Sequence, residues 1–326
     1  SFAISDQSIR KYAYYVLVTV VASLTWLHFR NNRINTVFLR TLYFILKLIL
    51  VHSVINFFMF FLIKNNLLVI STERNDYDTF LNIFFYMTER NNINVFGLEM
   101  CRNQGLFWEP GILQFFLNML FFLEAFMLKR KKILLLVTAF AVLTTYSTTG
   151  LALLLLQVFV YGFYEFKRNK ILIPIILILI YPVYIITSIN LGEKIQGEKE
   201  ASFQKRLFDL TQPLFIAFEH PLTGIGLDQD QFMHMRQKFY FSSPKFIDLQ
   251  QKTGINLTVT DTDKGSSNSI TFLLAATGFP TAFLLLYLFL KQQIITNKKW
   301  LWMIIMFVSV MAEPLFLRPF FFIFVF

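Results

Sequence analysis

The sequence has little of what holds a water-soluble or secreted domain together. It has one cysteine, Cys101, which excludes a fold built on disulfide bonds. Only 15% of its 326 residues are charged and 56% are hydrophobic, whereas soluble chains have about 25% and about 45–50%. These figures exclude a disordered chain and a cytosolic enzyme with one compact core. The excess of apolar side chains must face lipid, so the composition indicates a membrane protein.

The motifs of common soluble chemistry are also absent. The four histidines have no cysteine or carboxylate partner at the spacing of metal ligands on a helix, so neither a metal nor another cofactor is expected. The sequence contains no glycine-rich phosphate loop ending in Lys-Ser/Thr and no Gly-x-Ser-x-Gly nucleophile turn. The net charge of +10 fits nucleic-acid binding poorly, because the basic residues gather at the ends of apolar runs. No nucleic-acid partner is expected.

Long apolar runs divide the chain into segments that can cross a membrane. A helix needs about 20 mostly apolar residues to span a hydrocarbon layer of about 30 Å. The runs of this length are Tyr12–His28, Tyr43–Ile63, Gly111–Leu128, Ile171–Ile189 and Ser269–Leu290. A longer run, Ile133–Phe166, is interrupted at residues 146–150 and predicts two short helices. A last apolar region covers Trp300–Phe326.

The basic residues predict the orientation of these spans. Lys and Arg gather in short connections at residues 30–40, 129–132, 167–170 and 291–299. With Ile133–Phe166 as a hairpin, all of these connections fall on one side, which the positive-inside rule makes cytoplasmic. Two longer polar stretches, Lys64–Pro110 and Asn190–Asn268, then share the opposite side.

The predicted fold is therefore all-α: a polytopic membrane helix bundle whose large extracytoplasmic loop forms a small helical cap. The bundle covers residues 1–189, with a first periplasmic loop at 64–110. The large periplasmic loop covers 190–268, and C-terminal transmembrane helices cover 269–326. In the first loop, the apolar stretch 80–85 predicts a helix lying on the membrane surface. The chain begins without Met and ends in a phenylalanine run, so we expect it to be part of a longer chain.

An ionisable pair stands where the first outer loop re-enters the apolar sequence. Arg102 and Glu109 flank Gly105 and two aromatic residues, and Pro110 suits the first turn of the helix that follows. Ionisable side chains at a membrane boundary are costly, which favours a functional site. The alternative is that Glu109 is an acidic cap of that helix.

Further polar groups lie in and after the large outer loop. Arg206 precedes Asp209 by three residues, a spacing that fits either a helix-surface ion pair or a guanidinium that binds phosphate. Asn268, after Ser267, either caps the next helix or adjoins free amides that suit an anion. His220 precedes a glycine-rich turn and fits packing better than catalysis.

Three ionisable side chains fall inside the predicted spans. They are Lys47, His52 and Glu124. Such residues favour a function within the membrane. The alternative for Lys47 is that its long side chain extends towards the cytoplasmic surface.

Taken together, these stretches resemble the bacterial O-antigen polymerase and O-antigen ligase superfamily. The resemblance rests on Arg102–Gly111, on Thr145–Gly150 after a basic loop, on Arg206 followed by His220–Leu227, and on Ser267–Ser269 leading into a helix with a mid-span Gly278. It covers about residues 95–290.

The resemblance implies a metal-independent glycosyltransferase, embedded in the bacterial inner membrane with its active site facing the periplasm. A glycan on undecaprenyl diphosphate passes to a hydroxyl of an acceptor, which is another lipid-linked repeat unit for polymerases and the lipid A core for ligases. The implied partners are this lipid-linked oligosaccharide and membrane lipid, together with a flippase and a chain-length regulator of the same pathway.

The resemblance also suggests roles for the residues singled out above. Arg206 and Arg102 would stabilise the leaving diphosphate, and Glu109 would accept the proton of the incoming hydroxyl. Asp261 and Glu313 are weaker candidates for the proton acceptor. The expected substrate-binding residues are Asn268, Ser267, Ser147, Gly150, His220 and Gly224.

The chain departs from the ligase pattern at two positions; the second departure favours a polymerase, as does the Glu-Pro-Gly sequence at 109–111. The chain has Thr148 where ligases often carry an arginine, and Ser267 where they place a histidine. The alternatives are a ligase and, outside the enzymes, a flippase or other transporter. A transporter is expected to show internal repeats and broken helices, and the sequence shows one interrupted run and no repeat.

Overall fold

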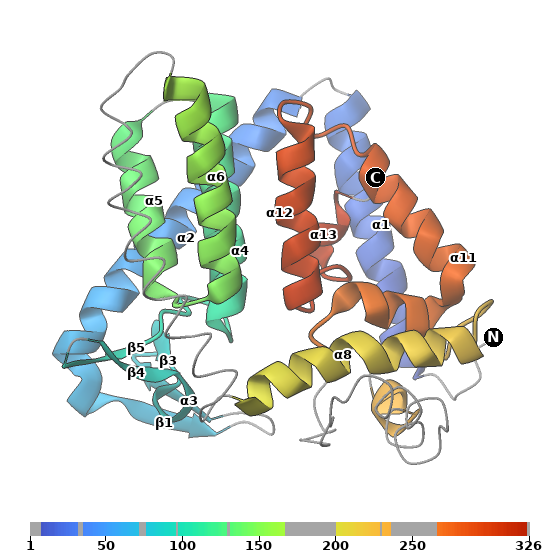
Figure 1. The fold of residues 1–326 in the computed structure, drawn as a ribbon, viewed down its shortest axis with the longest axis horizontal. Coiled ribbons are helices and arrows are strands. Elements are labelled where there is room, and N and C mark those ends of the chain that lie inside the picture. The colour runs from blue at the N-terminus through green and yellow to red at the C-terminus, as the bar shows by residue number, and fades with distance from the viewer. Residues whose placement is uncertain are drawn as a thin grey trace. The chain divides into compact units, whose positions relative to one another are not determined.

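The computed structural model is mostly helical with few strands (Figure 1), which confirms the predicted all-α membrane helix bundle. It describes residues 8–31, 35–71, 76–95, 97–128, 131–166, 200–228, 230–235 and 266–324. The predicted span Ile171–Ile189 and the candidate Asp261 lie outside these residues. The chain divides into a terminal unit, residues 1–35, 191–296 and 306–326, and a central unit, residues 36–190 and 297–305.

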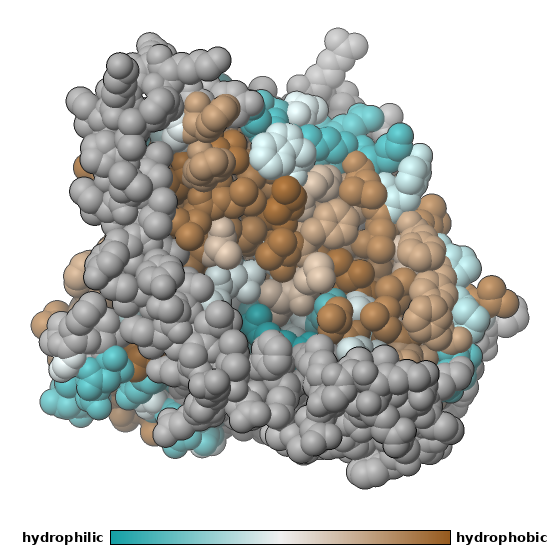
Figure 2. Space-filling model, viewed as in Figure 1, coloured by the Kyte–Doolittle hydropathy of each residue, from teal (hydrophilic) through white to brown (hydrophobic). Residues whose placement is uncertain are grey.

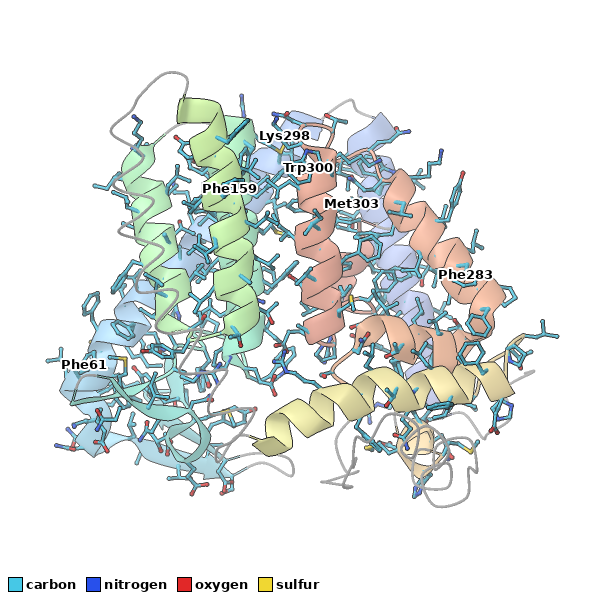
Figure 3. All side chains as sticks on the ribbon, in the orientation of Figure 1. Phe61, Phe159, Phe283, Lys298, Trp300 and Met303 are labelled. Atoms are coloured by element: carbon cyan, nitrogen blue, oxygen red, sulfur yellow. The ribbon has the colours of Figure 1, made fainter. Side chains whose placement is uncertain are left out.

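Among the described residues, four helical stretches are long and apolar enough to cross a membrane. They lie in α1 (Ile9–Asn31), in α2 (Asn35–Ile63) with the short helix η1 (Lys64–Asn66), in α4 (Pro110–Phe122) with the π-helical turn η2 (Leu123–Leu128), and in α11 (Ser269–Lys291). Each coincides with one of the predicted spans. Apolar side chains cover the sides of the helices (Figure 2), as contact with lipid requires. Phe61 on α2, Phe159 on α6 (Thr148–Phe166) and Phe283 on α11 are exposed by 40%, 65% and 57% (Figure 3).

The interrupted apolar run folds as the predicted pair of helices. α5 (Lys132–Thr144) ends at the interruption, and α6 begins after it. Tyr146 takes a positive φ of 51° in the turn between them. Ser147 Oγ accepts a hydrogen bond from the backbone N–H of Gly150 at 3.3 Å, in the manner of a helix N-cap. The Ser/Thr/Gly sequence therefore stops one helix and starts the next.

Helix α4 forms the core of the central unit, because every residue from Pro110 to Phe122 is buried. It packs against α5 and α6. Polar side chains join α4 to α6: Asn118 Nδ2 donates to the carbonyl of Gly150 at 3.2 Å, and Gln157 Nε2 donates to Asn118 Oδ1 at 2.8 Å. This short amide network is fully buried within an otherwise apolar interface.

The predicted surface helix at residues 80–85 is wrong, because this stretch forms the turn of a β-hairpin. The strands of the first outer loop are β1 (Leu68–Ser71), β2 (Asp76–Phe80) and β3 (Phe84–Tyr86), which form one antiparallel sheet, and β4 (Asn92–Val95) and β5 (Leu98–Cys101), which follow the short helix α3 (Thr88–Asn91). Phe80 pairs with Phe84 across a turn in which Leu81 and Asn82 have positive φ angles. A short apolar run has no periodicity that separates a strand from a helix.

The outer-loop strands are fixed to the end of α2. Tyr86 Oη donates to the carbonyl of Asn56 at 2.8 Å, and a ring nitrogen of His52 lies 3.0 Å from the carbonyl of Ile83. Cys101 is 3% exposed. Burial raises the pKa of the Cys101 thiol to about 11 and raises the pKa of the Tyr86 phenol as well.

At the other end of the central unit, the described parts of two basic connections, at 131–132 and 297–299, lie near a buried carboxylate. Glu124 is 1% exposed and accepts hydrogen bonds from Tyr43 Oη at 2.7 Å and from the backbone N–H of Lys131. Asn297, beside Lys298, donates to the carbonyl of Phe126 at 2.7 Å. The basic residues and the first outer loop therefore lie at opposite ends of this unit, as the predicted topology requires (Figure 1).

The terminal unit is built on α8 (Glu200–Glu219), which packs against α11. It also contains α1 and α13 (Pro319–Phe322), which contact each other, and part of α12 (Lys299–Ala312). α8 is a continuous helix of 20 residues. Its C-terminal half joins a buried apolar cluster of Ile216, Ile225, Phe232, Phe272, Ala275 and Ala276.

Candidate active site

In the central unit, the stretch that begins at Arg102 docks on the turn between α5 and α6. Arg102 Nε donates to the carbonyl of Thr145 at 3.2 Å, and the backbone N–H of Asn103 donates to the carbonyl of Thr144 at 3.0 Å. Arg102 is half-buried. Two of the motifs that carry the family resemblance, about forty residues apart in the chain, are therefore in direct contact.

Asn103 holds this contact in place, and sequence reasoning missed it. Its Nδ2 donates to the carbonyl of Ser53 at 2.9 Å and to Thr144 Oγ1 at 3.0 Å. Its Oδ1 accepts from the N–H of Gly105 at 3.1 Å and from Asn56 Nδ2 at 3.3 Å. Because every partner except Gly105 is distant in sequence, no local pattern marks this asparagine. It fixes the backbone next to Arg102 and so limits where the guanidinium can lie.

Glu109 occupies the N-cap position of α4, but its carboxylate does not cap the helix. The residue is extended (φ −148°, ψ 144°), its side chain makes no capping hydrogen bond, and Pro110 follows it. Only its carbonyl is used by the helix, accepting the N–H of Ile112 at 3.1 Å. The side chain is exposed. This geometry leaves the carboxylate available at a helix N-terminus, where the helix dipole favours negative charge.

Ser147 and Gly150 lie at the same turn, and both have a structural role there. Ser147 caps α6, as described above. A Cβ atom on Gly150 would lie 2.7 Å from Gln114 Cβ, so only glycine lets α6 approach α4 this closely. Both residues shape the turn on which Arg102 rests.

In the terminal unit, Asp209 ties α8 to the start of α11. Its carboxylate is fully buried and accepts hydrogen bonds from the N–H of Ser267 at 2.9 Å and from Ser267 Oγ at 2.7 Å. The carbonyl of Asp209 also accepts from Thr271 Oγ1 at 3.0 Å. Arg206 lies one turn earlier on α8 and is exposed. Asp209 therefore anchors α8 to the start of α11.

Asn268 is the N-cap of α11. Its Oδ1 accepts the N–H groups of Ile270 and Thr271, both at 3.1 Å. These two amides are therefore occupied by the cap, which favours the capping alternative over the anion site at the same amides. Ser267 and Asn268 hold the junction between α8 and α11.

His220 and Gly224 form the turn after α8. The N–H of His220 donates to the carbonyl of Ile216 at 3.0 Å, and its carbonyl accepts from the N–H of Gly224 at 3.1 Å. Gly224 has a φ of +64°, and a Cβ atom there would lie 2.5 Å from the carbonyl of Ala276. The backbone of His220 therefore helps to close the turn, and Gly224 is required for close approach of two backbones.

The predicted site residues thus form two groups. Arg102, Glu109, Ser147 and Gly150 belong to the central unit, and Arg206, His220, Gly224, Ser267 and Asn268 belong to the terminal unit. The weaker candidate Glu313 is buried, and its carbonyl accepts from Ser269 Oγ at 2.8 Å. Within the described part of the chain, no three His, Cys, Asp or Glu side chains gather in a way that could hold a metal ion.

Comparison with known proteins gives one family match. A family model described as O-antigen ligase matches residues 133–286, a region that begins in α5 and ends within α11. The match confirms the resemblance to the O-antigen polymerase and ligase superfamily. It supports a ligase-like or polymerase-like function in general. Neither the curated proteins nor the solved structures gave a match.

Proposed function

We propose that the chain is a polysaccharide polymerase that extends O-antigen, capsule or exopolysaccharide repeat units. It transfers a glycan from undecaprenyl diphosphate to a hydroxyl of another lipid-linked repeat unit, at the outer leaflet of the bacterial inner membrane. The observation that carries the proposal is the docking of Arg102 on the turn at 144–147, which lies in the region matched by the family model. A second arginine, Arg206, is exposed on α8 within the matched region.

The proposed reaction is a substitution at the anomeric carbon of the donor sugar. The bond from this carbon to the diphosphate oxygen breaks with its electron pair, and the acceptor hydroxyl oxygen forms the new glycosidic bond. Arg206 and Arg102 stabilise the negative charge on the departing diphosphate, because fixed cations in a poorly hydrated site act more strongly than in water. Glu109 takes the hydroxyl proton. No metal takes part in this proposal.

The remaining candidate residues act by positioning in this proposal. Ser147 and Gly150 shape the turn under Arg102. Ser267 fixes α8, which carries Arg206, and Asn268 caps α11. Hydroxyl and amide groups at these junctions would contact sugar hydroxyls at the edge of the site. A flippase would deliver the lipid-linked units and a chain-length regulator would limit their extension.

An O-antigen ligase is the second candidate, because that is how the matching family is described. The absence of the ligase histidine at Ser267 favours the polymerase. A transporter is less well supported. α11 does contain a break at Gly278, but a protein turn fills it rather than an open cavity.

Incubation of the purified full chain with undecaprenyl-diphosphate repeat units tests the proposal. We expect laddered products that differ by one repeat unit, formed after addition of EDTA as well. A ligase would instead give one product, and only when lipid A core is added. Movement of the lipid-linked unit across vesicles without any new glycosidic bond would contradict both enzyme proposals.

The proposed orientation predicts which cysteines an impermeant maleimide reaches in intact cells with a permeabilised outer membrane. Leu68→Cys in the first outer loop and Leu222→Cys in the large loop, exposed by 69% and 73%, should both be labelled from outside. The native Cys101 should stay unlabelled until the protein is denatured, because it is buried and its pKa of about 11 leaves very little thiolate at neutral pH. Labelling of the two introduced cysteines from opposite sides of the membrane would overturn the proposed site.

A further inference from the structure

Helix α11 is broken in the middle of its apolar stretch. Gly278 has φ 75° and ψ 168°, which is not helical, and Pro280 follows two residues later. In a continuous helix, the carbonyl of Ala275 would accept the N–H of Phe279, and the carbonyl of Ala276 would accept the N–H at position 280. Proline has no N–H, so the second of these bonds cannot form. The break therefore separates the carbonyls of Ala275 and Ala276 and the N–H of Phe279, among other groups, from their helical partners within an apolar segment.

The turn after α8 supplies a partner for each of these three groups. The N–H of Ile225 donates to the carbonyl of Ala275 at 2.9 Å, and the N–H of Gly226 donates to the carbonyl of Ala276 at 2.8 Å. In return, the N–H of Phe279 donates to the carbonyl of Pro221 at 2.7 Å. Buried backbone N–H and carbonyl groups are costly when unpaired, and these three bonds pair three of the groups at the break.

Two glycines make this exchange sterically possible. A Cβ atom on Gly224 would lie 2.5 Å from the carbonyl carbon and oxygen of Ala276. A Cβ atom on Gly278 would lie 2.5 Å from the carbonyl oxygen of Leu222. Each glycine faces the backbone of the other segment, and both have positive φ angles. Backbone atoms cannot move aside as a flexible side chain can, so both positions require glycine.

Side chains close the contact on either side of the exchanged bonds. Ile225 is fully buried in the cluster that includes Ala275, Ala276 and Phe272. The rings of Phe218, near the end of α8, and Phe279, just after the break, lie 5.4 Å apart. The turn is therefore held by apolar packing as well as by backbone bonds.

From these contacts we infer that residues 221–226 and the break at Gly278 form a latch that positions α8, and with it Arg206, for transfer. α8 is fixed at two places on α11. Asp209 holds Ser267 at the start of α11, and the latch holds the end of α8 at the break. Arg206 lies one turn beyond the first of these points, so its place depends on both. Gly224 and Gly278 are thus positioning residues. The inference rests on the proposed transferase function.

The variant Gly278→Ala/Pro280→Ala tests the latch without removing helical hydrogen bonds. It restores an N–H at position 280 and a helical backbone at 278, so α11 can pair its own carbonyls at 275 and 276. The turn then loses its partners. We expect the full-chain protein to insert and purify normally while amide exchange in the peptide containing Ile225 and Gly226 accelerates at least tenfold. We expect kcat in the ladder assay to fall at least tenfold with a smaller change in KM.

Gly97→Ala is the matched control. Gly97 also has a positive φ, of +82°, but a Cβ atom there would meet nothing within 4 Å. In the Gly97→Ala variant, amide exchange at residues 225–226 and the ladder of products should both match those of the wild type. Slow exchange at 225–226 in the double variant would overturn the latch itself, whatever the activity. Fast exchange with an unchanged kcat would overturn its positioning role. If the wild-type chain makes no ladder, the proposed function fails, and the exchange measurement still decides whether the latch exists.

Discussion

Replacing Arg206 with Ala should stop chain extension while the protein still inserts into the membrane. The exposed guanidinium can bind two oxygens of the diphosphate at once, and its loss removes stabilisation of the charge that develops there. Loss of one such preorganised donor lowers rates by about 10²–10³-fold. The measurement is the rate of ladder formation by the purified variant. Arg206→Lys should recover part of this loss, because lysine restores the charge but not the planar fork.

Lys64→Ala is a suitable control for the loss of one outer cation. Lys64 Nζ lies 4.0 Å from Glu99 Oε2, and both side chains are exposed. Such an exposed ion pair contributes little to stability. Its ladder should match that of the wild type. Normal polymer from Arg206→Ala at wild-type rate would remove Arg206 from the mechanism.

Replacing Glu109 with Gln should remove activity without changing expression or thermal stability. The carboxylate is exposed and makes no capping bond, so the amide should leave α4 intact. A positioned general base contributes about 10²–10⁴-fold, and the amide cannot accept the proton. The rate of ladder formation should therefore fall by about this factor, measured beside the melting temperature of the detergent-solubilised protein.

Glu99→Gln is the matched control for this change. It removes a carboxylate from β5 of the same outer loop, where the side chain is also exposed. It should retain wild-type activity. If Glu109→Gln makes polymer of wild-type length at the wild-type rate, the proton acceptor must be sought elsewhere.

The membrane spans could be predicted from the sequence because apolar length is a local property. The same holds for the break before α6, where Ser147 caps and Gly150 allows close packing, and for the cap at Asn268. In each case the residue type itself favours the local geometry. The position of Glu109 directly before α4 followed in the same way from Pro110.

The strands of the first outer loop could not be predicted, since runs as short as Phe84–Tyr86 fit either kind of structure. Asn103 and Asp209 could not be identified as anchors, because their partners lie far away in the chain. The sequence did show Gly278 as a glycine in the middle of a predicted span. Gly278 and Gly224 allow two backbone segments about fifty residues apart to come into contact, and no local pattern encodes this contact.

The amide network between α4 and α6 sets the register of these two helices. In lipid, apolar surfaces give neighbouring helices little preference for one axial alignment over another. Asn118 bonds both to the carbonyl of Gly150 and to Gln157, two points on α6 about two turns apart. Sliding α6 by a single turn would break both bonds and bring a side chain larger than glycine against Gln114. The network therefore opposes sliding of these two helices, and it fixes the turn under Arg102 relative to α4.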